Sequence, residues 1–129
     1  MFEIDTSSRV PIYQQLARQV REAIARGELA AEERLPSVRR LSRELVINPN
    51  TVARTYAELE REGLLVNRPG LGVFVAARRS ELTKAARERR LVERIDQCLT
   101  EAVHLGFAAD DVVRLVERRL KNFHWTAAG

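Results

Sequence analysis

Apolar residues recur every four positions over the first quarter of the chain: Ile12, Leu16, Val20 and Ile24. This spacing places them along one face of an amphipathic helix. Pro11 stands where the first turn of a helix tolerates proline. Gly27 is a residue of the kind that commonly follows a helix C-terminus. The pattern therefore predicts a helix between Pro11 and Gly27.

Two shorter helices follow, separated by a tight break. The first opens at Pro36 or Ser37 and runs to about Leu45, with Val38, Leu41 and Leu45 on one face. Asn48 is a good N-cap, and Pro49 fits the first helical position. The second helix runs from Pro49 to about Glu62, and Gly63 ends it. Its inner stripe is Val52, Tyr56 and Leu59.

Residues 64–67 and 73–75 are rich in apolar side chains and are predicted to form two short strands. The turn-rich segment 68–72 joins them and predicts a hairpin. Glu28-Leu29 is either a strand stub or a turn.

From Ser80 the chain is strongly helical again, and Gly106 closes this helix. A last helix starts at about Ala109, with Asp110 and Asp111 in its first turn, where acidic residues are favourable. The apolar positions alternate spacings of three and four, as a helix-helix seam requires. We assign to a dimerisation seam Val92, Ile95, Leu99, Ala102, Val103, Val116 and Leu120. Cys98, beside this seam, is expected to be a core residue.

These elements predict a mainly α fold with a small β wing. A winged helix-turn-helix at residues 1–77 is followed by a short helical dimerisation region at residues 78–129. Two amphipathic helices cannot form a core alone, whereas a twofold dimer would bury the stripes of both chains. The alternative is that the tail packs back on its own domain.

Composition narrows the class of protein. With 45% hydrophobic and 31% charged residues in 129, the chain has the composition of a soluble globular protein. It has no apolar run of the ~20 residues needed to span a bilayer, and its acidic start lacks the features of a signal peptide. A single cysteine cannot form an internal disulfide. We therefore expect a cytoplasmic protein.

Basic residues are unevenly distributed. The net charge is +4, and residues 36–56 hold four arginines against one acid, while residues 78–94 hold seven basic residues against three acids. Clustered cations suit a polyanion such as DNA. On charge alone, a solvated basic face is an equally good explanation.

The helix-break-helix unit favours DNA as the partner of these basic residues, because a projecting second helix fits the major groove of B-DNA. Its N-terminal end carries small polar groups and one arginine: Asn48, Asn50, Thr51, Arg54 and Thr55. Arg39 on the preceding helix can reach the DNA backbone or a guanine. At the hairpin tip, Arg68 lies beside Gly70 and Gly72, so backbone can approach the minor groove closely. Taken singly, each of these residues is better explained as a cap, a turn or a solvated side chain than as a DNA contact.

In this order the motifs resemble the winged-helix domain of the GntR family of bacterial transcription regulators. The resemblance covers residues 11–76, about half of the chain. The matching stretches are Pro11–Leu16, Glu33–Leu41, Asn48–Val52, Leu59–Leu65 and Arg68–Val75. The Asn-Pro-Asn-Thr sequence and the tail of only ~50 residues resemble the YtrA subfamily.

The resemblance implies a homodimer bound to double-stranded DNA at an inverted repeat, usually as a repressor. It implies DNA contacts at Arg39, Asn48, Asn50, Thr51 and the wing glycines. Many relatives carry arginine at the position where this chain has Pro49, so one expected base contact is missing. Pro69 is a second departure from the family pattern, and it stiffens the backbone just before the wing glycines.

Other classes of function find less support. No Gly-rich phosphate loop, placed carboxylate pair or nucleophile with a readable histidine partner indicates an enzyme. His104, His124 and Cys98 match no zinc spacing, so neither a metal nor a cofactor is predicted. A winged helix that binds protein or RNA would have an apolar recognition face, whereas the one predicted here is polar. No effector site is assigned, and the expected role of Phe123 and Trp125 is to fill a core or an interface.

Overall fold

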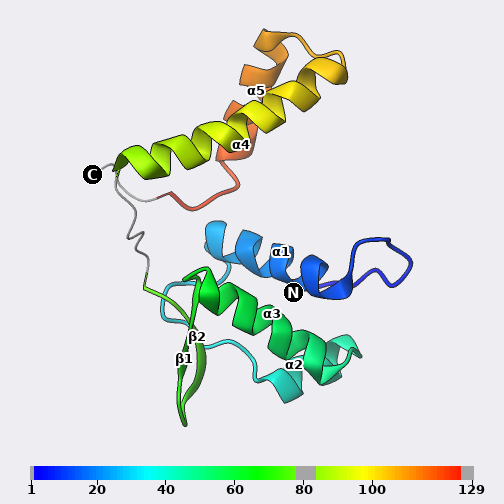
Figure 1. Ribbon diagram of the computed structural model, residues 1–129, viewed down its shortest axis with the longest axis vertical. Helices are drawn as coiled ribbons and strands as arrows, with labels where there is room; N and C mark the ends of the chain where they lie inside the picture. Colours follow the sequence, from blue (N-terminus) through cyan, green and yellow to red (C-terminus); the bar gives the residue numbers. More distant parts are fainter. Residues whose placement is uncertain (1, 78–83, 126–129) are drawn as a thin grey trace. The chain divides into compact units, whose positions relative to one another are not determined.

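The computed structural model describes residues 2–77 and 84–125, which form five helices and a two-stranded antiparallel sheet (Figure 1). This mainly helical fold with a small sheet confirms the predicted fold class. The chain divides into two compact units, one holding α1 to β2 and the other holding α4 and α5. The predicted domain junction at residues 77 and 78 and the predicted helix start at Ser80 reach into residues 78–83, which lie outside the described residues.

Three helices build the first unit, and local chemistry sets where each begins. Helix α1 spans Ile12–Ala25, α2 spans Val38–Leu45 and α3 spans Pro49–Arg61. The Ser37 hydroxyl accepts a hydrogen bond of 3.1 Å from the Arg40 N–H and caps α2. The Asn48 side chain accepts one of 2.8 Å from the Asn50 N–H, so the predicted cap of α3 is confirmed. Each cap satisfies an N–H that the helix itself leaves unbonded.

The sheet consists of β1 (Leu65–Arg68) and β2 (Gly72–Val75), paired from Leu65 opposite Val75 to Arg68 opposite Gly72. A third stretch of chain lies along the other edge of β2. The Leu35 N–H donates to the Val73 carbonyl and the Val75 N–H donates to the Glu33 carbonyl, both at 2.8 Å. Of the two alternatives at Glu28-Leu29, a strand stub or a turn, the structure has the turn, since both residues lie in a bend and Leu29 is a buried core residue.

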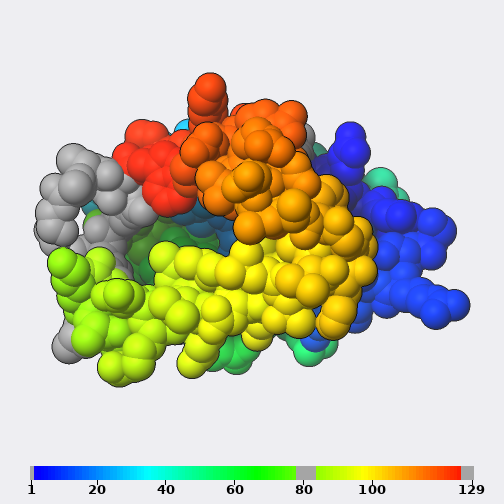
Figure 2. Space-filling view, turned by 90° about the horizontal axis from the view of Figure 1, so that it is seen from above, coloured from blue at the N-terminus to red at the C-terminus, as the bar shows by residue number. Residues whose placement is uncertain are grey.

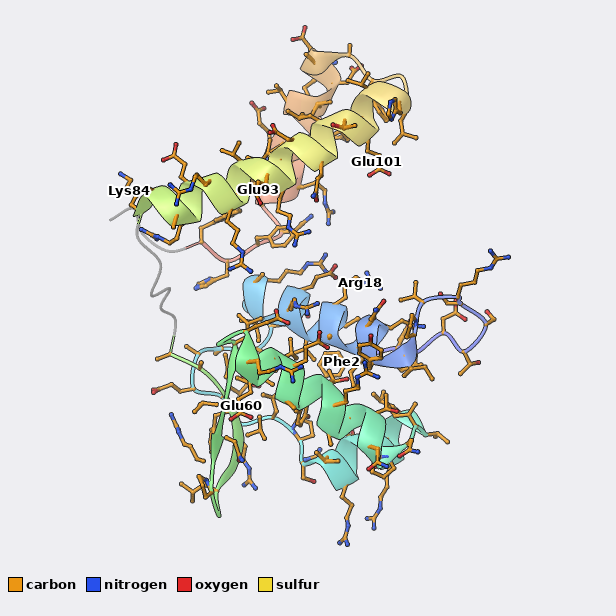
Figure 3. The ribbon with its side chains drawn as sticks, in the orientation of Figure 1. Phe2, Arg18, Glu60, Lys84, Glu93 and Glu101 are labelled. Carbon is orange, nitrogen blue, oxygen red and sulfur yellow. The ribbon has the colours of Figure 1, made fainter. Side chains whose placement is uncertain are left out.

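The core of the first unit lies between α1, α2, α3 and the sheet. The predicted stripes meet there, because Leu16 and Val20 of α1 and Val52 and Leu59 of α3 are all fully buried. Phe2, labelled in Figure 3, packs against this cluster from the N-terminal segment. The other buried apolar residues are Ala17, Ala23, Leu29, Leu35, Leu41, Tyr56, Leu65 and Val75.

Two glutamine side chains hold the N-terminal segment on α1. The Gln19 amide both accepts from the Glu3 N–H and donates to the Glu3 carbonyl. One turn earlier, the buried Gln15 amide does the same for Asp5 and also donates to the Val10 carbonyl at 2.8 Å. The side chains thus supply the hydrogen bonds that a neighbouring strand would give.

The second unit consists of α4 (Lys84–His104) and α5 (Ala109–Leu120), joined by a turn that contains Gly106 in a left-handed conformation. None of the described residues in either helix is buried. The surfaces of both, yellow-green to yellow and orange in Figure 2, are open to the viewer. The expectation that Cys98 is a core residue is wrong for this chain, since Cys98 is exposed. None of the helices among the described residues combines the length and apolar character needed to cross a membrane.

Candidate nucleic-acid interface

The break between α2 and α3 sets the position of the second helix. Val46 ends α2 in the left-handed conformation, with φ 55° and ψ 52°. The Tyr56 hydroxyl of α3 then donates a hydrogen bond of 2.7 Å to the Pro36 carbonyl, just ahead of α2. Burial, with a smaller contribution from the charge of Glu44, raises the pKa of Tyr56 well above its ordinary value. A neutral, hydrogen-bonded tyrosine therefore fixes α3 against the start of α2.

The N-terminal end of α3 presents polar side chains on the face away from the core. Asn48, Asn50 and Arg54 are exposed, and Thr51 is half-buried. Because the oxygen of Asn48 caps the helix, the amide NH2 of that residue is the group left to bind a ligand. Together these groups can donate to and accept from base edges and phosphates. The structure thus brings four of the predicted contact residues to one end of one helix.

Thr55, predicted to share this exposed face, does not belong to it. Its side chain is fully buried, and its hydroxyl donates to the Thr51 carbonyl at 2.9 Å and approaches the Tyr13 carbonyl at 3.4 Å. In a helix, residue 55 falls on the same face as Val52 and Leu59, which face the core. Thr55 is therefore part of the contact between α1 and α3 and is removed from the candidate interface.

Arg54 is held by an aromatic ring that the sequence reasoning did not single out. Its guanidinium carbon lies 3.7 Å from the centroid of the Tyr13 ring at the start of α1. A cation at this distance over an aromatic face is attracted by the ring quadrupole. No sequence spacing links the two residues, because their contact depends on the packing of α1 against α3.

Helix α2 adds exposed arginines beside α3. Arg39, Arg40 and Arg43 are all exposed, and the Arg40 Nε bonds to Glu44 at 2.8 Å. Within the described part of the chain, Arg39 and Arg43 form no ion pair with a carboxylate. Arg39 is therefore available to an external anion, as its predicted role requires.

The hairpin forms a wing next to α3, as Figure 1 shows. The Leu71 N–H donates to the Arg68 carbonyl at 2.9 Å, with Pro69 second and Gly70 third in the turn. Gly70 has φ 76°, which suits a type II turn. Arg68 is half-buried, with its guanidinium carbon 4.6 Å from the Phe74 ring centroid and Nη2 3.7 Å from Glu32.

Gly72 has a structural reason to be glycine. It has φ 121°, and a Cβ built on it would lie 3.0 Å from the Arg34 Nε. Arg34 is exposed and comes from the stretch beside β2, so it adds a cation to the wing that the spacing of the sequence did not indicate. Close approach of DNA at Gly70 and Gly72 stays a prediction.

Among residues 2–77 and 84–125, no group of three or more histidine, cysteine, aspartate or glutamate side chains is placed to hold a metal ion.

Comparison with known proteins gives a consistent result. The model of the family described as "Bacterial regulatory proteins, gntR family" matches residues 12–75. The chain is 33% identical over 106 residues to the HTH-type transcriptional repressor YtrA of Bacillus subtilis (strain 168), covering 82% of each chain.

Two solved structures are also similar. YtrA from Sulfolobus acidocaldarius, described as a GntR-family transcription factor, is 34% identical, with a TM-score of 0.59 over 73% of this chain and 95% of that one. A transcriptional antiterminator from Listeria monocytogenes EGD-e is 27% identical, with a TM-score of 0.79 over 100% of this chain and 98% of that one.

Proposed function

The chain belongs to the GntR family of bacterial regulatory proteins, and from that premise we propose that this DNA-binding transcription regulator is a homodimeric repressor of an inverted-repeat operator. Its relatives are transcription regulators, so the chain belongs to a class of regulators and not of enzymes. Similarity to a protein named as a transcriptional repressor supports the direction of regulation. Action on chromosomal DNA would place the protein in the cytoplasm.

The observation that carries the proposal is the polar end of α3. Its inner face is buried core, while Asn48, Asn50 and Arg54 are exposed at its N-terminal end. A recognition helix that binds protein would instead expose apolar residues there. In this proposal, α3 enters the major groove and Arg39 binds the backbone or a guanine. The wing, with Arg68, Gly70 and Gly72, lies along the minor groove.

Dimerisation is assigned to the second unit, so that residues 1–77 bind DNA and residues 78–129 join two chains. The support is the exposed apolar seam of α4 and α5, in which Ile95 is 45% exposed, Leu99 42% and Val116 48%. Apolar side chains at helical spacing on a surface favour association. Two copies related by a twofold axis would present two α3 helices to two half-sites of a palindrome.

The DNA-binding proposal is tested by selecting duplexes from a random pool with the full-length protein. We expect an inverted repeat to be enriched, and Arg39→Ala and Asn50→Ala to bind it at least about fivefold more weakly. Arg18→Ala is the matched control. It also removes one exposed charge, and Figure 3 shows Arg18 on the side of α1 away from α2. Normal binding by both interface variants would show that the recognition helix is misassigned.

The dimer is tested by measuring mass with light scattering or analytical ultracentrifugation. Ile95→Glu and Leu99→Glu each place a charge in the seam and should convert a dimer into a monomer. Gln97→Glu introduces the same side chain on the opposite face of α4 and should leave the mass unchanged. A dimer that survives both seam variants would contradict the assignment. It would place the dimer contact on another surface, whereas a monomeric wild-type protein would favour the alternative in which the tail packs on its own domain.

A further inference from the structure

The contact between Tyr13 and Arg54 joins the first turn of α1 to the exposed end of α3. The Arg54 guanidinium carbon lies 3.7 Å from the ring centroid, which is closer than the roughly 6 Å limit for a cation–π interaction. Arg54 is exposed and Tyr13 is half-buried. The ring is therefore the firm member of the pair and the guanidinium the solvent-facing one.

The Tyr13 ring is itself held in place. The Gln14 amide nitrogen donates to the Tyr13 hydroxyl at 3.1 Å. The hydroxyl of the buried Thr55, the residue next to Arg54 on α3, donates to the Thr51 carbonyl and lies 3.4 Å from the Tyr13 carbonyl. Ring and guanidinium are thus tied to each other through the packing of two helices, and neither depends on a mobile loop.

Stacking occupies the face of the guanidinium but leaves its N–H groups at the edge, where they can donate to an anion. No carboxylate among the described residues forms an ion pair with Arg54. Its positive charge is therefore oriented and not neutralised. Ordering the side chain in the free protein also lowers the entropy lost when a ligand binds.

The position of the pair indicates which part of DNA it would meet. Arg54 is one helical turn beyond Asn50, on the exposed side of α3. Because Tyr13 belongs to α1, stacking holds the guanidinium on the side of α3 that faces α1. With α3 in the major groove, as proposed above, this side would face the edge of the groove and not its floor. Phosphates border the groove, whereas base edges lie at its floor.

We propose that Tyr13 is a positioning residue that presents the Arg54 guanidinium to a phosphate of the DNA backbone. This inference rests on the proposed DNA-binding function. It makes α1 part of the interface through a residue that acts by holding another.

The experiment measures the affinity of the full-length protein for two duplexes over a series of salt concentrations. One duplex is selected from a random pool by the wild-type protein, and the other is a shuffled sequence of the same composition. The variants are Tyr13→Leu, which removes the ring, Tyr13→Phe, which keeps it, Arg54→Ala, and the double variant of Tyr13→Leu with Arg54→Ala. Thermal unfolding of each variant confirms that it is folded at the assay temperature.

We expect Arg54→Ala to weaken binding to both duplexes by a similar factor and to lower the slope of log affinity against log salt by about 1. Tyr13→Leu should weaken binding about two- to fivefold, as expected from the loss of an exposed cation–π contact. Tyr13→Phe keeps the ring under Arg54 and loses only the exposed hydrogen bond from Gln14, so it should bind nearly as well as the wild type. In the Arg54→Ala background, Tyr13→Leu should have no further effect.

Three results would overturn the inference. Equal loss in Tyr13→Phe and Tyr13→Leu would mean that the hydroxyl itself is the contact. Additive effects in the double variant would mean that Tyr13 acts independently of Arg54. Loss confined to the selected duplex would mean that Arg54 binds a base. A wild-type protein that binds neither duplex would instead refute the proposed function, and the inference with it.

Discussion

Arg21 of α1 and Glu62, the residue that follows α3, form a two-point contact across 41 positions of sequence. The Arg21 Nε and Nη2 donate to the two carboxylate oxygens at 2.8 and 2.6 Å. Hydrogen bonding to Glu62 raises the pKa of Arg21 above its ordinary value. The pair clamps the C-terminal end of the recognition helix to the helix behind it.

Breaking this clamp should lower stability slightly. Both side chains are more than a third exposed, so solvent screening limits the pair to about 0.5 kcal/mol. We expect Arg21→Gln to lower the free energy of unfolding by that amount in urea denaturation. Arg18→Gln, which removes a more exposed pair with Glu22 within α1, should cost less than about 0.3 kcal/mol. Equal losses would show that the long-range clamp stabilises the fold no more than the exposed pair within α1.

Val46 strains the backbone of the turn between α2 and α3. It has φ 55° and is 88% exposed, so its side chain gains little packing in return for the strain. Val46→Gly should therefore raise the free energy of unfolding by about 0.5–1 kcal/mol, after allowance for the greater freedom of glycine in the unfolded chain. Val46→Ala retains a Cβ and should recover only part of this. A destabilised glycine variant would contradict the interpretation.

Tyr56 should make stability depend on alkaline pH. Its folded pKa is raised above 10.0, mainly by burial, so its contribution is fully present below pH 10. Above pH 10 the unfolded state can ionise while the folded state cannot, and stability falls as the pH rises. Chemical denaturation between pH 8 and 11 measures this loss.

Tyr56→Phe supplies the control for the pH effect. It removes the hydrogen bond to Pro36 and should cost about 1 kcal/mol at pH 8. It should also remove the part of the alkaline loss that comes from this hydroxyl. A variant as sensitive to alkali as the wild type would assign the effect to other groups.

The two wing glycines should respond differently to asparagine. Gly70 has φ 76° in open space, a conformation that asparagine tolerates, so Gly70→Asn should change stability by less than about 1 kcal/mol. Gly72 has φ 121° and Arg34 against it, so Gly72→Asn should cost about 1–3 kcal/mol. Thermal unfolding of the two variants side by side measures the difference. Equal tolerance would show that the hairpin adjusts freely at both positions.

Local signals were enough to predict most of the first unit. The Asn48 cap, the apolar stripes and the turn at residues 68–72 act over a few residues, so their patterns are visible in the sequence. The sequence narrows the start of α2 only to Pro36 or Ser37. Thr55 is the exception. Threonine is a polar residue and is expected on an exposed face, but here its hydroxyl donates to the Thr51 carbonyl and the side chain is buried.

Contacts between distant segments left no such pattern. Tyr13 beneath Arg54, Arg34 over Gly72, and the stretch beside β2 all join parts of the chain that only the tertiary fold brings together. The spacing of apolar residues predicts which face of a helix or strand is buried. It does not predict which other segment packs against that face or pairs with its edge.

The glutamine bonds to the N-terminal segment have a consequence for amide hydrogen exchange. The amide hydrogens of Glu3 and Asp5 are held by side chains of α1, although they belong to no helix or strand. Their exchange with solvent should therefore slow to the rate at which the segment leaves Gln15 and Gln19. The exchange rates of these two amides would therefore measure how often the N-terminal segment detaches from α1, the helix that packs against α3.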